Sequence, residues 1–481
     1  MPFPAAARRL ASLAAVAALA AGTTAPAVGA AEAGASSAKP GAPGIGDPYF
    51  PVDGNGGYDV RHYAVDVRYT LATGALSGST TLTARATQDL SRFNLDLVLA
   101  VDSVRIDGAP VSATKANRHE LVVTPSGPIR AGTVFTVAVD YHGTPQDVSS
   151  RGVMPWIASE TEALATNEPQ IAPWWFPAND HPRDKATFDI AVSVPAGQQA
   201  ISNGDLVATT SAGGWDTWRW RMDRPMATYL AFFAAGRFQT ESGVADGLPY
   251  FNAVSEGLEP ASRTMAMRLM RRSPGIVRWL ETQLGDYPFS STGGVTTSLF
   301  AGFALENQGR PTYPFLGNGG YARAVVVHEL AHQWFGDHVS VGRWRDIWLN
   351  EGFASWFEWR YDEAHGGRSA QQTMLSRYDG YADDDRMWDV RIGDPGPRNL
   401  FDFAVYERGA MAVQALRHRL GNDDFRRLLR TWVVEHGGGT GRVGGFQRLA
   451  ERVSGESLDG FFDAWLRTGR KPARTEANGL R

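Results

Sequence analysis

The segment His328-Glu329-Leu330-Ala331-His332 decides how this chain can be interpreted. It lies within a stretch from Ala322 to Phe335 that has helical length and no internal glycine or proline. In a helix, residues four apart lie on one face about one turn apart, so both histidines can reach a single cation. The pentapeptide therefore predicts a two-histidine metal clamp carried by a helix.

A third ligand is expected downstream, because catalytic zinc sites hold three protein ligands and keep one position for water. Glu351 follows His332 after 18 intervening residues, which allows a loop and the start of a second helix packed against the first. We therefore expect one zinc ion per chain, bound by His328, His332 and Glu351, although such ligands also accept cobalt or manganese. Glu329 is expected to take a proton from the water that the metal activates, without binding the metal itself.

Length and composition bound the possibilities further. A chain of 481 residues is too long for one ordinary domain, and its 43% hydrophobic and 20% charged residues are typical of a folded protein. The formal charge of -4 favours neither nucleic acid nor an anionic membrane as a partner. The chain has no cysteine, so a metal must be held by histidines and carboxylates.

The N-terminus reads as a signal peptide over residues 1–30. Arg8 and Arg9 precede an apolar run from Leu10 to Ala21, and the small residues Val28-Gly29-Ala30 form a cleavage site. We therefore expect a secreted, extracellular protein without stable membrane insertion; a short membrane anchor is the alternative. Residues 31–46 are rich in Ala, Gly, Ser and Pro, which predicts a flexible linker.

Two domains are expected after the linker. Residues 47–243 show apolar alternation with period two, which predicts a β-rich domain; the clearest runs are Tyr63, Val65, Val67, Tyr69; Phe135, Val137, Val139, Tyr141; and Phe188, Ile190, Val192, Val194. Residues 244–470 show helical spacing instead, as in Met265, Leu269, Ile276 and Leu280. Residues 471–481 are polar and are predicted to form a mobile tail.

Several ordered motifs resemble the gluzincin zinc aminopeptidase family, which includes membrane alanyl aminopeptidase and leukotriene hydrolase. The likeness rests on the run from His328 to Gly336 and on Trp348-Leu349-Asn350-Glu351-Gly352-Phe353-Ala354, and it covers about residues 47–466. It implies an α+β multidomain fold, with a saddle-like N-terminal β-rich domain followed by a mainly helical, thermolysin-like zinc peptidase domain. The chain ends too early to contain the C-terminal helical domain of the family's long members.

The resemblance also implies roles for further residues. Phe303-Ala304-Leu305-Glu306-Asn307 is similar to the family's exopeptidase motif, whose glutamate binds the substrate's free ammonium. This gives Ala304, Glu306 and Asn307 substrate-binding roles, with Phe303 and Leu305 departing from the family pattern. Glu168, twelve residues before Asp180, falls where relatives carry an acidic substrate-binding residue. Tyr406, in Val405-Tyr406-Glu407-Arg408-Gly409-Ala410, matches the tyrosine that stabilises the oxyanion.

The function expected from these residues is zinc-dependent aminopeptidase activity on peptides with a free N-terminus, by a protein that acts as a monomer. Glu329 would serve as general base and then general acid, with Tyr406 stabilising the oxyanion. Two alternatives stay open at the level of the sequence. A thermolysin-type zinc endopeptidase would share the metal clamp but lack the ammonium anchor, and a catalytically idle binding module would use the β-rich domain instead.

Overall fold

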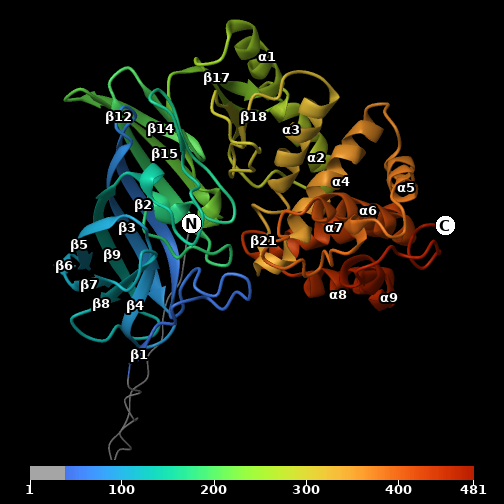
Figure 1. Ribbon diagram of the computed structural model, residues 1–481, viewed down its shortest axis with the longest axis horizontal. Helices are drawn as coiled ribbons and strands as arrows, with labels where there is room; N and C mark the ends of the chain where they lie inside the picture. Colours follow the sequence, from blue (N-terminus) through green and yellow to red (C-terminus); the bar gives the residue numbers. More distant parts are fainter. Residues whose placement is uncertain (1–37) are drawn as a thin grey trace, which may run out of the picture. The chain divides into compact units, whose positions relative to one another are not determined.

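The computed structural model describes residues 38–481 (Figure 1). The predicted signal peptide and the first part of the predicted linker lie outside these described residues. Within the described part of the chain, no helix is both long enough and apolar enough to cross a lipid bilayer.

The end of the predicted linker is part of the folded chain. Strand β1 (Lys39–Pro40) pairs in parallel with β4 (Leu90–Asp96), and the Gly41 amide donates a hydrogen bond of 2.8 Å to the Arg92 carbonyl. Backbone pairing requires no large side chain, so a segment rich in Ala, Gly and Pro can still add to a sheet edge. The expectation of a flexible linker as far as Gly46 is therefore corrected for residues 38–46.

An eight-stranded sheet dominates the N-terminal part, with the strand order β14-β15-β12-β2-β3-β9-β5-β6. Its strands are β2 (Tyr58–Thr70), β3 (Ala75–Ala86), β5 (Ala100–Ile106), β6 (Ala109–Pro110), β9 (Val134–Gly143), β12 (Ala186–Pro195), β14 (Asp205–Ala212) and β15 (Trp215–Met226). The three predicted alternating runs form β2, β9 and β12, and their apolar residues are buried on one face of the sheet. The prediction of a β-rich N-terminal region is confirmed.

Two four-stranded sheets complete this region. The first contains β1, β4, β7 (Ser112–Lys115) and β8 (Glu120–Thr124). The second contains β10 (Ile157–Ala158), β11 (Ala163–Ala165), β13 (Gln199–Ser202) and β16 (Phe233–Gly236). β11 leads directly into the segment that carries Glu168, so this second sheet positions a predicted site residue.

The boundary between the two regions lies earlier than predicted. The predicted end at Gly243 falls inside β17 (Phe238–Ala245), which pairs along its whole length with β18 (Leu248–Ser255). β18 pairs in parallel with β19 (Thr292–Thr296), which pairs in parallel with β20 (Thr312–Tyr313). β17 therefore belongs to the sheet of the C-terminal region. Only Phe238 of β17 is buried, so its sequence does not assign it to either region, and its pairing partners do.

The C-terminal region is mainly helical, as predicted. Its helices are α1 (Pro260–Met270), α2 (Ser273–Leu284), α3 (Gly320–His332), α4 (Trp348–Ala364), α5 (Ala370–Gly380), α6 (Phe403–Leu420), α7 (Asn422–His436), α8 (Val443–Ser454) and α9 (Asp459–Phe462). A short parallel pair, β21 (Ser340–Val341) and β22 (Thr440–Gly441), connects the segment after α3 to the segment after α7. The predicted fold class, a β-rich domain followed by a mainly helical domain, is confirmed.

The predicted mobile tail is packed against the helices. Leu480 is 4% exposed, the Trp465 indole donates to the Asn478 carbonyl at 3.0 Å, and Arg474 forms an ion pair of 2.8 Å with Asp379 of α5. A mostly polar segment can be held by hydrogen bonds and one apolar anchor, which composition alone does not reveal. The expectation of a mobile tail over 471–481 is therefore corrected.

The two regions are joined by side chains that precede β12. The Lys185 ammonium donates to the carbonyls of Asp337 at 2.5 Å and His338 at 3.0 Å, directly after α3. The Arg183 guanidinium donates to the Gly342 carbonyl at 3.2 Å. The β-rich region thus holds the loop that connects α3 to α4, the two helices that carry the predicted metal ligands.

Candidate active site and metal centre

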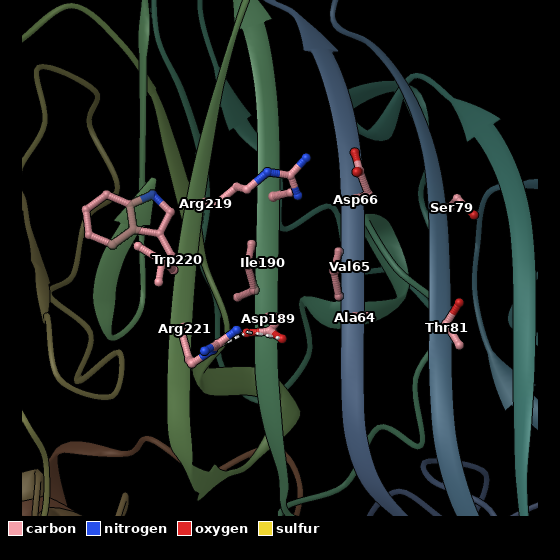
Figure 2. Close-up of a pocket in the computed structure, with 12 residues that line it drawn as sticks. Ala64, Val65, Asp66, Ser79, Thr81, Asp189, Ile190, Arg219, Trp220 and Arg221 are labelled. Carbon is pink, nitrogen blue, oxygen red and sulfur yellow. Dashed lines mark hydrogen bonds and ion pairs between the residues drawn. The ribbon is translucent and has the colours of Figure 1, made fainter. Parts of the chain in front are cut away.

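One cavity, of about 440 Å³, lies on a face of the eight-stranded sheet (Figure 2). Its charged side chains come from β2, β12 and β15, and Arg221 of β15 forms an ion pair of 2.7 Å with Asp189 of β12. The described residues that line it include no histidine, and so do not supply the predicted metal site.

A second cavity, of about 560 Å³, contains most of the predicted site residues. Side chains from α3, α4, α5 and α6 line it together with the segment from Gly302 to Glu306 and with Glu168 of the β-rich region. Eight of the nine predicted site residues line it: Glu168, Ala304, Glu306, His328, Glu329, His332, Glu351 and Tyr406. Asn307 is the exception.

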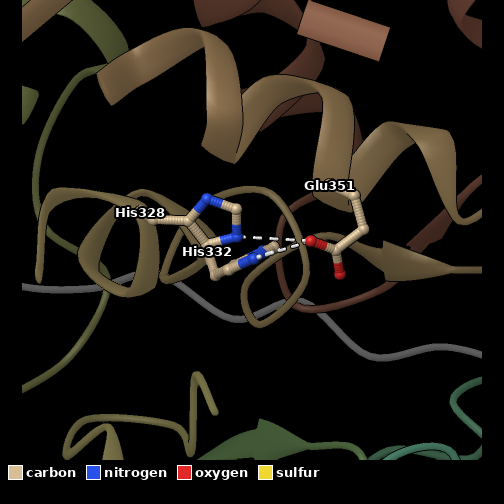
Figure 3. A group of neighbouring side chains, drawn as sticks. All are labelled: His328, His332 and Glu351. Atoms are coloured by element: carbon tan, nitrogen blue, oxygen red, sulfur yellow. Dashed lines mark hydrogen bonds and ion pairs between the residues drawn. The ribbon is translucent and has the colours of Figure 1, made fainter. Parts of the chain in front are cut away.

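The two histidines and Glu351 converge on one point (Figure 3). Nε2 of His328 lies 3.3 Å from Oε2 of Glu351, and Nε2 of His332 lies 3.5 Å from the same oxygen. Two donors bound tetrahedrally to zinc at about 2.1 Å lie roughly 3.4 Å apart, so these separations suit a single zinc ion. The donor set of two imidazoles and one carboxylate also suits zinc and leaves a position for water.

Helix geometry produces this convergence. His328 and His332 lie one turn apart on α3, which begins at Gly320 rather than at Ala322 and ends at His332 rather than at Phe335. After His332 the last turn is tightened by hydrogen bonds that span three residues rather than four. The Gln333 amide donates to the Leu330 carbonyl, and the Trp334 amide donates to the Ala331 carbonyl. Glu351 lies in the first turn of α4, as expected for a second helix packed against the first.

The second nitrogen of each histidine is also occupied. His328 Nδ1 lies 2.7 Å from Oε1 of Glu358, and His332 Nδ1 lies 3.0 Å from the Phe335 carbonyl. Such partners fix the ring orientation and the tautomer that offers Nε2 to a metal. Sequence reasoning missed Glu358, although its position seven residues after Glu351 places it two turns along the same face of α4.

The charges of the three ligands are arranged for a cation. Burial opposes ionisation of Glu351, but His332 and His328 hold its pKa at about 2. Burial lowers the pKa of His332, yet Glu351 and Glu306 outweigh it and raise this pKa to about 9. The carboxylates around the imidazoles favour positive charge at this position. A bound divalent metal ion would supply that charge.

Glu329 lies beside the predicted metal ligands and also close to Glu306. It is 5% exposed, and burial raises its pKa to about 8 against the opposing effect of His328 and His332. One carboxylate oxygen each of Glu329 and Glu306 and one nitrogen of His332 lie within 4.8 Å of one another. This proximity brings the predicted general base to the predicted ammonium anchor, which the sequence places more than 20 residues earlier.

Two side-chain hydrogen bonds hold Glu306 in place. The Tyr229 hydroxyl donates to its Oε1 at 2.9 Å, and the Gln333 amide group donates to its backbone carbonyl at 2.9 Å. Burial raises the pKa of Glu306, which is 2% exposed. The position of Gln333 directly after His332 could have indicated that it lies in the site. Tyr229 comes from the β-rich region, and nothing in the surrounding sequence indicates its contact with Glu306.

Glu168 faces the same end of the cavity. Its Oε1 is buried without a hydrogen-bond donor among the described residues. Burial raises its pKa first, and the next four contributions come from carboxylates, with Glu306 the largest of them. Carboxylates that repel one another in this way favour a cation beside them.

Tyr406 lies in the first turn of α6, whose N-terminus is capped by the Asp402 side chain accepting from the Ala404 amide at 2.9 Å. Its ring stacks on the His328 ring with centroids 6.1 Å apart. Burial, followed by the charges of Glu351 and Glu168, raises the pKa of Tyr406 well above its ordinary value of 10. The phenol therefore stays protonated and can donate a hydrogen bond near the metal site.

Asn307 does not line the cavity and instead forms buried hydrogen bonds behind it. It is fully buried, its Oδ1 accepts from the hydroxyls of Thr166 and Thr312 at 2.9 Å each, and its Nδ2 donates to the Leu230 carbonyl at 3.0 Å. Through Thr166 it connects the Glu306 segment to the segment that carries Glu168. The predicted substrate-binding role of Asn307 is therefore not reflected in its placement.

Comparisons with known proteins agree with this geometry. The model of the peptidase M1 N-terminal domain matches residues 60–230, and that of the peptidase family M1 domain matches residues 282–465. A solved M1 zinc metallopeptidase of Deinococcus radiodurans, in a variant form bound to a Tyr-Ser-Ala substrate, is 28% identical with a TM-score of 0.79, covering 90% of this chain and all of that one.

Curated relatives are longer than this chain. Aminopeptidase A of Gloydius brevicauda is 27% identical over 333 residues, which cover 63% of this chain and 34% of the relative. Aminopeptidase M1-B of Oryza sativa subsp. japonica is 27% identical over 446 residues, which cover 85% of this chain and 49% of the relative. The chain thus spans about half or less of the length of these curated relatives.

The two family domains follow each other in the chain in the same order as the β-rich and helical regions, and the solved relative covers both. The resemblance inferred from the metal-ligand motifs is confirmed, and zinc is the metal named in the solved relatives. The chain therefore belongs to the zinc-dependent peptidase family M1, and His328, His332 and Glu351 are a group that could hold its metal ion.

Proposed function

We propose that this protein is a zinc aminopeptidase that removes the N-terminal residue from peptides. The observation that carries the proposal is the placement of Glu306 and Glu168 at one end of the cavity, beside the metal ligands. Two carboxylates at the closed end can pair with a free ammonium, whereas the neutral amide of a mid-chain residue would leave both of them unpaired and buried.

Within this proposal, His328, His332 and Glu351 hold the zinc ion, which when bound activates water and polarises the scissile carbonyl. Glu329 accepts a proton from the attacking water and returns it to the departing amine, a task suited to a carboxylate whose pKa is raised to about 8. Tyr406 donates a hydrogen bond to the oxygen that gains negative charge during attack.

The main chain of Ala304 is suited to align the substrate. Leu305 exchanges both backbone hydrogen bonds with Thr312, at 2.9 Å and 2.8 Å. Because successive peptide groups of an extended chain point to opposite edges, the N–H and C=O of Ala304 point away from Thr312, and Ala304 lines the cavity. An extended peptide can add to this free edge with its ammonium at Glu306.

The test is hydrolysis of free and N-acetylated aminoacyl-arylamides, with and without a zinc chelator, by the wild-type protein and by Glu306→Gln. We expect chelator-sensitive hydrolysis of the free amines, none of the acetylated compounds, and a loss of at least a hundredfold in kcat/KM in the variant. Equal cleavage of blocked and free substrates would replace the aminopeptidase by an endopeptidase. Absence of any hydrolysis would favour the idle binding module.

We also propose that the protein is exported, because residues 1–30 carry the basic, apolar and small-residue segments of a signal peptide. These residues lie outside the described part of the chain. The N-terminal sequence of the protein recovered from culture medium tests this: a mature chain that begins near Ala31 is expected, and intact protein confined to the cells would contradict it.

A further inference from the structure

The active-site cavity has a closed end and an open end. At the closed end, Tyr229 and Glu306 are 1% and 2% exposed. The open end lies toward the N-terminus of α3 and the C-terminal half of α4, where Tyr321 is 76% exposed and Glu358 and Trp359 line the wall. Tyr321 lies two helical turns before His328 on α3, and Glu358 lies two turns after Glu351 on α4, with its Oε1 2.7 Å from His328 Nδ1.

Charge is distributed unevenly over this cavity. Carboxylates line it throughout, and they comprise Glu168, Glu306, Glu329, Glu351, Glu358 and Glu407. Arg377 of α5 is the only lysine or arginine among the described residues that line it. Its side chain is 53% exposed, so the guanidinium reaches solvent at the open end.

The nearby carboxylates do not use all the hydrogen-bond donors of Arg377, so it can bind a further carboxylate. Glu358 is already bound to His328 Nδ1 at 2.7 Å. Glu407 is paired with Arg377 at 3.3 Å, but the contact is to Nε of the guanidinium. The Arg377 side chain also hydrogen-bonds Tyr381, but a guanidinium has five N–H donors, which is more than these two partners require.

We propose that Arg377 binds a carboxylate carried by the part of the substrate beyond the scissile bond, and that the enzyme therefore favours substrates that carry one there. Either the C-terminus of a short peptide or an acidic side chain can supply this carboxylate. This inference rests on the proposed aminopeptidase function.

The experiment compares kcat/KM for Ala-Ala-Ala, Ala-Ala-Ala-amide and Ala-Ala-Asp-amide in the wild-type protein and in Arg377→Gln. In the wild type we expect the free acid to exceed the amide about tenfold, mainly through KM, and Arg377→Gln to bring this ratio close to one. Recovery of activity on Ala-Ala-Asp-amide would identify an acidic side chain as a second source of the carboxylate, and no recovery would identify the C-terminus alone.

Controls separate the two proposals. Arg323→Gln removes a guanidinium that pairs with Asp362 and does not line the active-site cavity, so this variant should keep the wild-type ratio. Arg377→Lys should retain part of the preference, because it keeps the charge but loses the fork. If the wild type hydrolyses alanyl-arylamide but treats acid and amide alike, the role of Arg377 is refuted while the aminopeptidase stands. If it hydrolyses neither arylamide nor peptide, the proposed function itself fails.

Discussion

Four glutamates line the cavity near one another: Glu306, Glu329 and Glu351 are buried and Glu168 is half-buried. Burying several carboxylates together is unfavourable unless positive charge is supplied. His328 and His332 supply it to Glu351, but each of the largest charge interactions on Glu168 is repulsive. At the scale of single residues, the site therefore favours two cations, a metal ion and a substrate ammonium.

The proposed role of Glu329 predicts a specific defect in turnover. Glu329→Gln removes the proposed proton acceptor while preserving the shape of the side chain and the three proposed metal ligands. We expect kcat to fall by about 10²- to 10⁴-fold, as is typical for loss of a general base. Zinc content, measured by elemental analysis, should stay at one ion per chain, and a variant that loses its zinc would show that Glu329 has a structural role instead.

The hydrogen bond from Glu358 to His328 predicts an effect on metal affinity. In Glu358→Gln the imidazole loses a charged partner, so we expect zinc to bind about 10- to 100-fold more weakly. Competition with a chelator of known affinity measures this. Asp362→Asn, a half-exposed carboxylate on the same helix, is the matched control and should bind zinc like the wild type; equal weakening in both would contradict the assignment.

At the scale of elements, the pairing of β4 with β8 places two like charges opposite each other. Asp96 of β4 lies directly opposite Glu120 of β8 in an antiparallel ladder, and both are buried. Burial, and next the Asp96 charge, raise the pKa of Glu120 to about 7 from its ordinary value of 4.5. Like charges in opposite positions destabilise a sheet, so this pairing should weaken as Glu120 ionises.

The raised pKa fixes the sign of a pH effect on stability. The folded state holds the Glu120 proton more tightly than the unfolded state, so the associated stability is complete below about pH 4.5 and is lost as the pH rises through 7. The glutamine in Glu120→Gln cannot ionise, so we expect the variant to have the larger free energy of unfolding at pH 8. Between pH 5 and pH 8, the difference in free energy of unfolding between the variant and the wild type should shift in favour of the variant by up to about 3 kcal/mol.

Denaturant unfolding at the two pH values measures this difference. Glu160→Gln replaces an exposed glutamate of the same region and should show no such pH-dependent gain. A Glu120→Gln variant that is equally stable, relative to the wild type, at pH 5 and pH 8 would show that Glu120 remains paired in both protonation states.

At the scale of the whole molecule, the two family domains form one connected structure. Lys185 and Arg183 bind backbone carbonyls after α3, and Tyr229 of the β-rich region binds Glu306 at the active site. Thr166 of the β-rich region likewise binds Asn307. A ligand bound between His328, His332 and Glu351 should therefore stabilise the β-rich region as well as the helices.

This connection predicts a single cooperative unfolding transition for residues 38–481, with a Tm that falls by several degrees when zinc is removed. Calorimetry with and without a chelator tests it. Glu329→Gln should keep the zinc-dependent shift, because its metal ligands are intact, whereas His332→Ala should lose it. Two separate transitions, of which only one responds to zinc, would show that the domains unfold independently.

The sequence by itself predicted the residues proposed as metal ligands and general base, and it predicted the order of the two domains. Each of these depends on a periodicity inside one segment: His328 and His332 are one helical turn apart, and the strands alternate with period two. Such local patterns follow from backbone geometry and do not need a tertiary partner to be recognised.

Only the tertiary structure decided the rest of the site and the ends of the domains. Tyr229, 77 residues from Glu306 in sequence, carries no local mark of its hydrogen bond to that carboxylate. The assignment of β17, the packing of residues 38–46 and 471–481, and the burial of Asn307 also depend on partners far along the chain. The physical reason is that hydrogen bonds and burial depend on which segments meet in space, and a pattern within one segment does not specify that.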